Sequence, residues 1–171
     1  MTKPIEVPDA TGSPVEYRDS LLALAGDRDP LAILATTPDA VAALCAGAEP
    51  EWPAAAGEWS AADIVGHLLD AELAFGFRWR LALTADEPTY PGYDEKGWAG
   101  LPKAPLDELV ATFRHLRAHD LHLLRGLGPA ELRRVGVHGE QGPETVDVNI
   151  RKLAGHDLLH LDQLKRAVGA D

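Results

Sequence analysis

Cysteine is nearly absent from this 171-residue sequence, because Cys45 is the only one. A single cysteine excludes an intrachain disulfide, and it also excludes a metal site built from several thiolates. The apolar residues around Cys45 indicate a small buried side chain. We therefore do not count Cys45 among the candidate functional residues.

Positive charge is also scarce. The chain carries 16 Lys and Arg residues against 27 Asp and Glu, which gives a formal net charge of -11. Non-specific nucleic-acid binding depends on Lys and Arg side chains that neutralise phosphates. The charge balance therefore argues against a nucleic-acid partner and against an anionic membrane surface.

Long apolar runs are missing. No stretch approaches the roughly 18 apolar residues that a membrane span requires, and residues 1–8 lack the charged start and apolar run of a signal peptide. Hydrophobic content of 46% and charged content of 25% are typical of a globular chain, whose length suits one domain. We expect a cytoplasmic protein with no membrane partner.

Sustained strand-like alternation is absent as well, and helical periodicity predicts an all-α fold. We expect an extended N-terminal arm over residues 1–14 and one helical domain over residues 15–171. Short helices are predicted at 15–25, at 29–35 and, after a new start at Thr37-Pro38-Asp39, up to about 47. Longer helices are predicted at 60–83, 105–125 and from 145 onward, with irregular loops over 88–105 and 126–143. The first of these loops either covers a site or is an ordinary surface loop.

The last predicted helix carries two histidines on its apolar face. His156 and His160 are four residues apart, so their side chains lie on the same side of a helix. Buried imidazoles need hydrogen-bond partners, and a divalent metal is one way to satisfy both, as in H-E-x-x-H zinc sites. A chance pair of satisfied core histidines is the alternative.

The helix over 60–83 begins with a capping signal, Ser60 followed by Asp63. It is apolar around most of its circumference and is therefore predicted to be largely buried. Its polar stripe contains His67, Asp70 and Arg78. From the pattern alone, this stripe either faces water or lines a cleft.

The helix over 105–125 holds a rival group of histidines, His115, His119 and His122. Helical geometry places them opposite the apolar face, where exposed histidines are ordinary. Arg117 and Asp120 fall on the core face instead, where they either pair with each other or serve a site.

Two stretches together resemble the DinB-like superfamily, particularly its YfiT-like group. The first, residues 59–72, has a Trp-Ser pair, an acidic residue at position 63 and a His-Leu pair at 67–68. The second, residues 155–163, joins His156 and Asp157 to His160 and Gln163. His138 and Gly142, just before the last helix, agree with the resemblance, which extends from about residue 20 to the C-terminus.

The resemblance implies an up-down-down-up four-helix bundle, here with extra short N-terminal helices. It also implies a metal site formed by three histidines that face into the bundle. Carried over residue by residue, these are His67, His156 and His160. Three neutral imidazoles with open coordination positions suit Zn²⁺ or Ni²⁺.

The resemblance further implies an S-transferase that moves a low-molecular-weight bacterial thiol, mycothiol or bacillithiol, onto an electrophile. A metal-bound thiol loses its proton near neutral pH, and a bound water is activated similarly for hydrolysis. The alternatives are therefore a metal-dependent hydrolase and a non-catalytic small-molecule-binding protein of the stress response. Supporting catalytic roles are assigned to Asp70, Asp157 and Gln163, each of which is otherwise an ordinary satisfied polar residue.

A zincin peptidase is disfavoured, because the residue after His156 is Asp rather than Glu and only eleven residues follow His160. Relatives of this kind often form dimers. We therefore expect a small-molecule thiol and an electrophile as partners, and a homodimer as the assembly.

Overall fold

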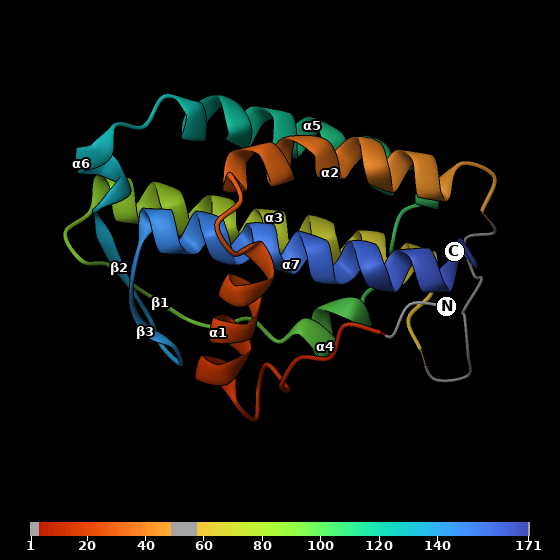
Figure 1. Ribbon diagram of the computed structural model, residues 1–171, viewed down its shortest axis with the longest axis horizontal. Coiled ribbons are helices and arrows are strands. Elements are labelled where there is room, and N and C mark those ends of the chain that lie inside the picture. Colours follow the sequence, from red (N-terminus) through yellow and green to blue (C-terminus); the bar gives the residue numbers. More distant parts are fainter. Residues whose placement is uncertain (1–3, 49–57, 171) are drawn as a thin grey trace.

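Four long helices form the body of the computed structural model, which describes residues 4–48 and 58–170. The helices are α2 (Pro30–Cys45), α3 (Ala61–Thr84), α5 (Leu106–Arg125) and α7 (Val146–Ala167). Figure 1 shows α2 and α5 in one layer and α3 and α7 in the other. Both α3 and α5 run opposite to α2 and α7, so the predicted up-down-down-up bundle is confirmed. The division into an arm and a domain stays a prediction.

A short helix, α1 (Pro14–Ala25), crosses the outer face of α7 (Figure 1). The crossing is very close at Gly155, where a Cβ atom would lie 1.9 Å from the carbonyl oxygen of Leu21. Only glycine leaves room for this approach. As a result, α1 lies directly against the turn of α7 that carries His156.

The predicted helix break at Thr37-Pro38-Asp39 is wrong, because α2 continues through Pro38. Proline cannot donate the hydrogen bond to the carbonyl four residues earlier, which here belongs to Leu34. Arg117 of α5 donates to that carbonyl instead, from Nη1 at 3.0 Å. A tertiary contact thus replaces the missing helical hydrogen bond.

The segment between α3 and α5 returns along the length of the bundle, because these two helices run in the same direction (Figure 1). It was predicted to be irregular, but it contains strand β1 (Thr89–Tyr90) and helix α4 (Glu95–Ala99). Its far end is tied to the first turn of α3 by an ion pair of 3.0 Å between Lys103 and Asp63. The segment therefore lies across one side of the bundle.

A small sheet also contradicts the expectation that strands are absent. Strands β2 (Val135–His138) and β3 (Gly142–Thr145) form an antiparallel hairpin, and β1 pairs with β2 in parallel. The hairpin overlaps the second predicted loop and extends two residues beyond it, and the same loop contains the short helix α6 (Pro129–Leu132). Gly142 has a φ of 80°, a conformation that glycine adopts without strain. The sheet closes one end of the bundle (Figure 1).

The described part of the bundle contains two large apolar clusters rather than one continuous core, and a smaller third cluster lies between α1 and α7. One of the large clusters includes Phe75 and Leu153, and the other includes Leu68 and Leu164. Between them in the sequences of α3, α5 and α7 lie four buried charged residues, Glu72, Arg117, Asp120 and Asp157. A polar layer therefore separates the two clusters.

The outer surface of α3 is more exposed than its apolar sequence predicts. Leu73 and Phe77 are 51% and 58% exposed, so the prediction of a largely buried helix is wrong for this face. In the described part of the chain, no helix combines the length and the apolar character needed to cross a membrane.

Candidate metal centre

Three buried histidines converge inside the bundle, His67 from α3 and His156 and His160 from α7. One ring nitrogen from each lies within 4.8 Å of the others. Their ring centroids are 4.3 to 4.8 Å apart. The helical spacing of the second and third, and the contact between α3 and α7, bring the three together.

Local sequence features fix these positions. The side chain of Ser60 accepts a hydrogen bond from the backbone of Asp63, whose carboxylate accepts from the backbone of Ser60. This predicted capping box starts α3 two turns before His67 and so sets which face of α3 that histidine occupies. Thr145 caps α7 in a similar way, by accepting from the backbone of Val148.

The ring nitrogens are short of partners. His67 Nδ1, His156 Nδ1 and His160 Nε2 are buried without a hydrogen-bond partner in the described structure. The Nε2 atoms of His67 and His156 are 2.9 Å apart, a little closer than the separation of about 3.3 Å between two nitrogens on one tetrahedral zinc. The three imidazoles therefore fit a shared divalent ion.

Electrostatics also favour metal binding. Burial lowers the pKa of His67 and His156 well below the ordinary histidine value, and the neighbouring histidines add to the shift. Burial lowers the pKa of His160 to about 4, although its hydrogen bond to Gln163 opposes the shift. All three rings are consequently neutral at pH 7, which is the state that binds a metal.

Gln163 orients His160. Its Oε1 atom lies 2.8 Å from Nδ1 of His160. An amide oxygen only accepts, so the proton of the neutral ring lies on Nδ1 and the lone pair on Nε2. Gln163 was predicted to assist the site, and this contact gives it a definite position, although its catalytic role stays a prediction.

Aromatic side chains form the walls around the histidines. Trp59 meets His67 edge-on at 4.9 Å between centroids and stacks against His160 at 6.3 Å. Tyr93 belongs to the segment between α3 and α5, and its ring centroid lies 6.5 Å from that of His67. The position of Tyr93 agrees with the view that this segment covers a site. No local sequence pattern predicts that Trp59 contacts two histidines.

Asp157 does not contact the histidines, although it follows His156 in the chain. Its carboxylate accepts from Arg117 Nη1 at 2.6 Å and from Nη2 at 3.2 Å. Arg117 also donates from Nε to Glu72 at 2.8 Å. Of the sequence's two alternatives for Arg117, pairing with Asp120 is wrong, because Asp120 pairs with Arg80 at 2.8 Å.

Asp70 lies half-buried on α3. Burial raises the pKa of its carboxyl, and the nearby Lys103 opposes that shift. Asp70 has no hydrogen bond to the three histidines in the described structure. The catalytic roles predicted for Asp70 and Asp157 stay predictions.

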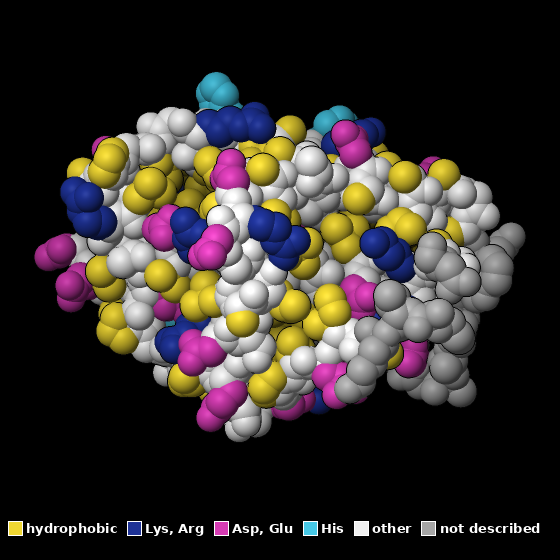
Figure 2. Space-filling view, viewed as in Figure 1, with side chains coloured by type: hydrophobic (Ala, Val, Ile, Leu, Met, Phe, Trp, Pro, Cys, Tyr) yellow, Lys and Arg dark blue, Asp and Glu magenta, His cyan; other side chains and the backbone are white. Residues whose placement is uncertain are grey.

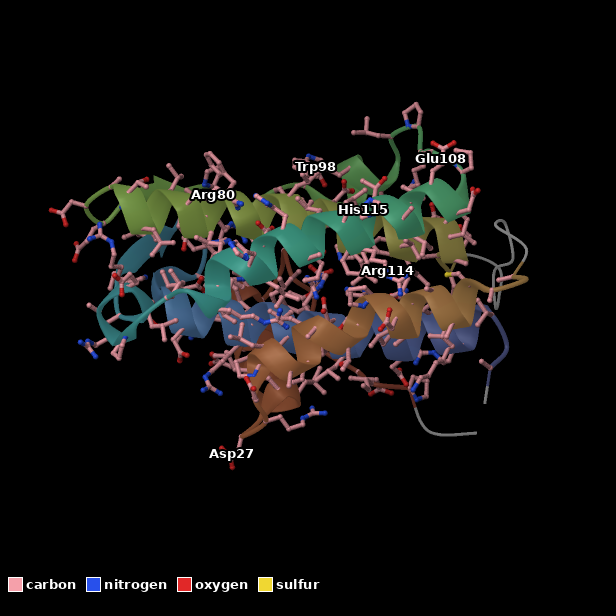
Figure 3. The ribbon with its side chains drawn as sticks, turned by 90° about the horizontal axis from the view of Figure 1, so that it is seen from above. Asp27, Arg80, Trp98, Glu108, Arg114 and His115 are labelled. Atoms are coloured by element: carbon pink, nitrogen blue, oxygen red, sulfur yellow. The ribbon has the colours of Figure 1, made fainter. Side chains whose placement is uncertain are left out.

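The rival histidines His115, His119 and His122 are exposed, as their helical position predicts. Histidine side chains project from the edge of the molecule over α5 in Figure 2, and Figure 3 labels His115 on that helix. Within residues 4–48 and 58–170, the trio of His67, His156 and His160 is the only cluster of three or more His, Cys, Asp or Glu residues with metal-binding spacing.

A cavity of about 240 Å³ adjoins His156. Its lining includes His156, Tyr93, Arg78, Lys152 and His138. These residues come from α7, the covering segment, α3 and the hairpin, so distant parts of the sequence meet here. The cavity gives a small molecule access to the side of His156.

Comparison with known sequences identifies the family. The sequence profile of the DinB superfamily matches residues 33–164, which is most of the chain and includes all three histidines. The chain belongs to the DinB superfamily. This agrees with the motifs at residues 59–72 and 155–163.

Relatives within the DinB superfamily carry names that assign them provisionally to the metal-dependent hydrolases. One from Oceanobacillus iheyensis is 32% identical over 107 residues, covering 61% of this chain and 62% of that protein. Another, from Bacillus mycoides, is 32% identical over 110 residues, which cover 63% of this chain and 64% of that protein. The chain thus spans less than two thirds of the length of either relative.

A solved structure shares the fold. YfiT from Bacillus subtilis, which is described provisionally as a metal-dependent hydrolase with an unusual four-helix bundle topology, matches with a TM-score of 0.73. The match covers 99% of this chain and 95% of YfiT at 22% sequence identity. At that identity, the likeness establishes the four-helix-bundle fold of this chain and nothing further.

Proposed function

We propose that this protein is a metal-dependent enzyme whose divalent ion is held by His67, His156 and His160. One observation carries the proposal: three neutral, buried imidazoles converge, with the Nε2 atoms of His67 and His156 2.9 Å apart and Nε2 of His160 buried without a partner in the described structure. Unpaired buried polar atoms are costly, and three nitrogen ligands with an open position are typical of catalytic zinc sites. The names of the relatives agree with this assignment.

The proposed reaction is transfer of a low-molecular-weight thiol, such as mycothiol or bacillithiol, onto an electrophile. Zn²⁺ or Ni²⁺ in the site would lower the pKa of a bound thiol or water. The sulfur attacks the electrophilic carbon, the carbon–sulfur bond forms as the bond to the leaving group breaks, and the thiol proton passes to solvent. Trp59 and Tyr93 exclude bulk water, and Gln163 keeps the lone pair of His160 on Nε2.

Hydrolysis is the second candidate, because the relatives are named as hydrolases. A zinc peptidase of the H-E-x-x-H type uses a carboxylate as general base next to the metal. In the described structure, the nearest such candidate in sequence, Asp157, is held by Arg117 instead. A thiol is more acidic than water and needs a base less, which is why we place thiol transfer first.

The first test is the metal content of untagged protein, measured by elemental analysis. We expect about one ion per chain in the wild type, loss of the ion in His156→Ala, and retention in His119→Ala. The last variant is a matched control, because His119 is exposed on α5. Metal that follows His119, or that Zn²⁺ and Ni²⁺ cannot restore, would overturn the proposal.

The second test separates the two reactions. Metal-loaded protein is assayed with mycothiol, bacillithiol and glutathione against a panel of electrophiles, and in parallel with a panel of esters and amides. Thiol-dependent conjugation that is lost in His156→Ala supports the transferase. Hydrolysis without a thiol supports the second candidate, and a loaded site with neither activity leaves a small-molecule-binding protein.

A homodimer and a cytoplasmic location remain proposals. The exposed Leu73 and Phe77 on α3 are the residues at which we would test self-association. Sedimentation velocity of the wild type against Phe77→Glu measures it directly.

A further inference from the structure

Arg78 is a buried cation beside the proposed metal site. Its side chain leaves α3 into the interior, the residue is only 5% exposed, and it lines the same cavity as His156. Removing a charge from water is costly unless the charge is paired. The partners of Arg78 therefore need to be accounted for.

The described residues satisfy little of this guanidinium. It has one hydrogen bond, from Nη2 to the carbonyl oxygen of Pro91 at 3.3 Å. Its central carbon lies 5.2 Å from the ring centroid of Phe75 and 5.4 Å from that of Tyr90, which are cation–π contacts. An arginine offers five N–H donors, so most of them are free for another acceptor.

No carboxylate in the described structure lies within ion-pair distance of Arg78, unlike the other buried cations. Arg117 pairs with two carboxylates, and Lys152 pairs with Glu144 at 2.6 Å. Glu144 is also held by Asn149 at 2.8 Å. Glu144, the carboxylate with the largest electrostatic effect on Arg78, is therefore already engaged.

Three further acids, Asp94, Glu95 and Glu140, line the cavity without an ion pair to Arg78 in the described structure. Asp94 and Glu140 are exposed, and Asp94 accepts the backbone N–H of Gly97. Burial raises the pKa of Glu95, and the opposing effect of Arg78 is smaller. In the described structure, none of these three acids is therefore a close counter-ion of the guanidinium.

His138 provides a second donor on the cavity wall. Its Nδ1 accepts the backbone N–H of Glu140 at 3.2 Å. Burial, together with the charges of Arg78 and Lys152, lowers the pKa of His138 to about 4. The ring is therefore neutral at pH 7, with its proton on Nε2.

We propose that Arg78 binds a carboxylate group of the substrate in the cavity beside the three histidines. This inference rests on the proposed function, since it names the substrate class of the same site. A carboxylate matches the planar fork of a guanidinium with two hydrogen bonds. It would also supply the counter-ion that the described residues do not.

The spacing along α3 sets the shape of that substrate. Arg78 comes eleven positions after His67, which is about 16 Å along a helix at 1.5 Å per residue. Its side chain leans back toward the start of the helix, which shortens the gap. The substrate therefore carries its carboxylate several bonds away from the atom that reacts.

The test measures binding of glutarate and of its uncharged diamide, glutaramide, by isothermal titration calorimetry. The full chain is treated with EDTA so that no metal contributes. The variants are Arg78→Met, Arg78→Lys and, as a matched control, Arg114→Met. Arg114 lies on α5 and forms an ion pair with Asp39 on the surface (Figure 3).

We expect the wild type and Arg114→Met to bind glutarate about tenfold or more tightly than glutaramide, the usual size of a charge-assisted hydrogen bond. Arg78→Met should lose this preference. Arg78→Lys, which keeps the charge but not the fork, should bind glutarate more weakly than the wild type and still prefer it to glutaramide. Thermal unfolding of each variant checks that it is folded. If Arg78→Met does not fold, the glutarate affinity of Arg78→Lys alone tests the inference.

Equal binding of glutarate and glutaramide to the wild type would overturn the inference. Equal glutarate binding by folded Arg78→Met and Arg114→Met would overturn it too. Because the titration uses metal-free protein, the carboxylate subsite is tested even if the chain proves to bind no metal. Failure of the metal site and failure of the subsite are therefore separate results.

Discussion

The side-chain oxygen of Gln163 lies 2.8 Å from Nδ1 of His160, one turn away on the same helix. This contact decides which nitrogen of His160 is available as a ligand, because the ring proton must face the acceptor. Nε2 is the atom left buried and without a partner. Gln163, which is not itself a proposed metal ligand, thus determines which ring nitrogen of His160 can bind the metal.

Replacing Gln163 with methionine should weaken metal binding. The acceptor for Nδ1 is lost, and loss of such an orienting partner typically costs roughly 10- to 100-fold in metal affinity. Competition with a chromophoric zinc chelator measures the change. Gln163→Glu is the control, because it retains an acceptor at the same place and should lose less. Equal affinities for all three proteins would contradict the assigned role.

Replacing Arg117 with methionine should strongly destabilise the fold. Glu72 and Asp157 would remain buried without a cation, and breaking such a pair from one side costs roughly 3–5 kcal/mol. Urea unfolding of the metal-free protein measures the loss. The double variant Arg117→Met with Asp157→Asn removes an orphaned carboxylate and should recover part of the lost stability. A loss below about 1 kcal/mol in the single variant would contradict the described network.

Replacing Gly155 with alanine should also lower stability. The new Cβ would lie 1.9 Å from the carbonyl oxygen of Leu21, so α1 must move away from α7. We expect the free energy of unfolding to fall by about 1–3 kcal/mol, as it does at other overpacked sites. Gly66→Ala is the matched control, because its Cβ would meet only the flexible side chain of Lys103, at 3.1 Å. That variant should be neutral or slightly stabilising, since alanine favours a helix. Equal losses in the two variants would contradict the close approach of α1.

The stability of the metal-free protein should fall as the pH drops from about 6.5 to about 4, in part because of His138. Burial lowers its pKa from 6.5 to about 4 in the folded chain, so the unfolded chain binds the proton first. The contribution of His138 is present above pH 6.5 and is lost as the pH falls through 4. The full shift corresponds to about 3 kcal/mol, and we expect about 1–2 kcal/mol because water in the cavity screens the ring.

His138→Asn tests this pH dependence, because asparagine keeps an acceptor for the Glu140 backbone and does not titrate. Urea unfolding should show that the free energy of unfolding falls less between pH 7 and pH 5 in this variant than in the wild type. His119→Asn, on the surface of α5, should behave like the wild type. Identical losses in all three proteins would argue against a buried neutral His138.

Much of the helical architecture is predictable from local patterns. The capping signal of Ser60 and Asp63 locates the start of α3, and helical spacing places His156 and His160 on one buried face. These features depend on residues within one or two turns of each other. The pairing of the two histidines with His67 was not available from spacing and came from the family resemblance.

The failures arise where distant residues decide the outcome. Pro38 is a reasonable helix break unless Arg117, 79 positions later, supplies the hydrogen bond that the proline cannot. Strand β1 has two residues and is defined by its pairing with β2, more than forty positions away. The cavity between Arg78 and His138 has the same origin, because no local pattern brings α3 to the hairpin.

The guanidinium of Arg117 touches every long helix of the bundle, since it belongs to α5 and bonds to Leu34 of α2, Glu72 of α3 and Asp157 of α7. Opening α3, α5 or α7 would leave a buried charge without a partner, and opening α2 would take an acceptor from the buried guanidinium. Backbone amides at the centre of all four should therefore exchange with deuterium at a common slow rate, through whole-molecule unfolding. The peripheral α1 and α4, which bond to none of these groups, should exchange sooner.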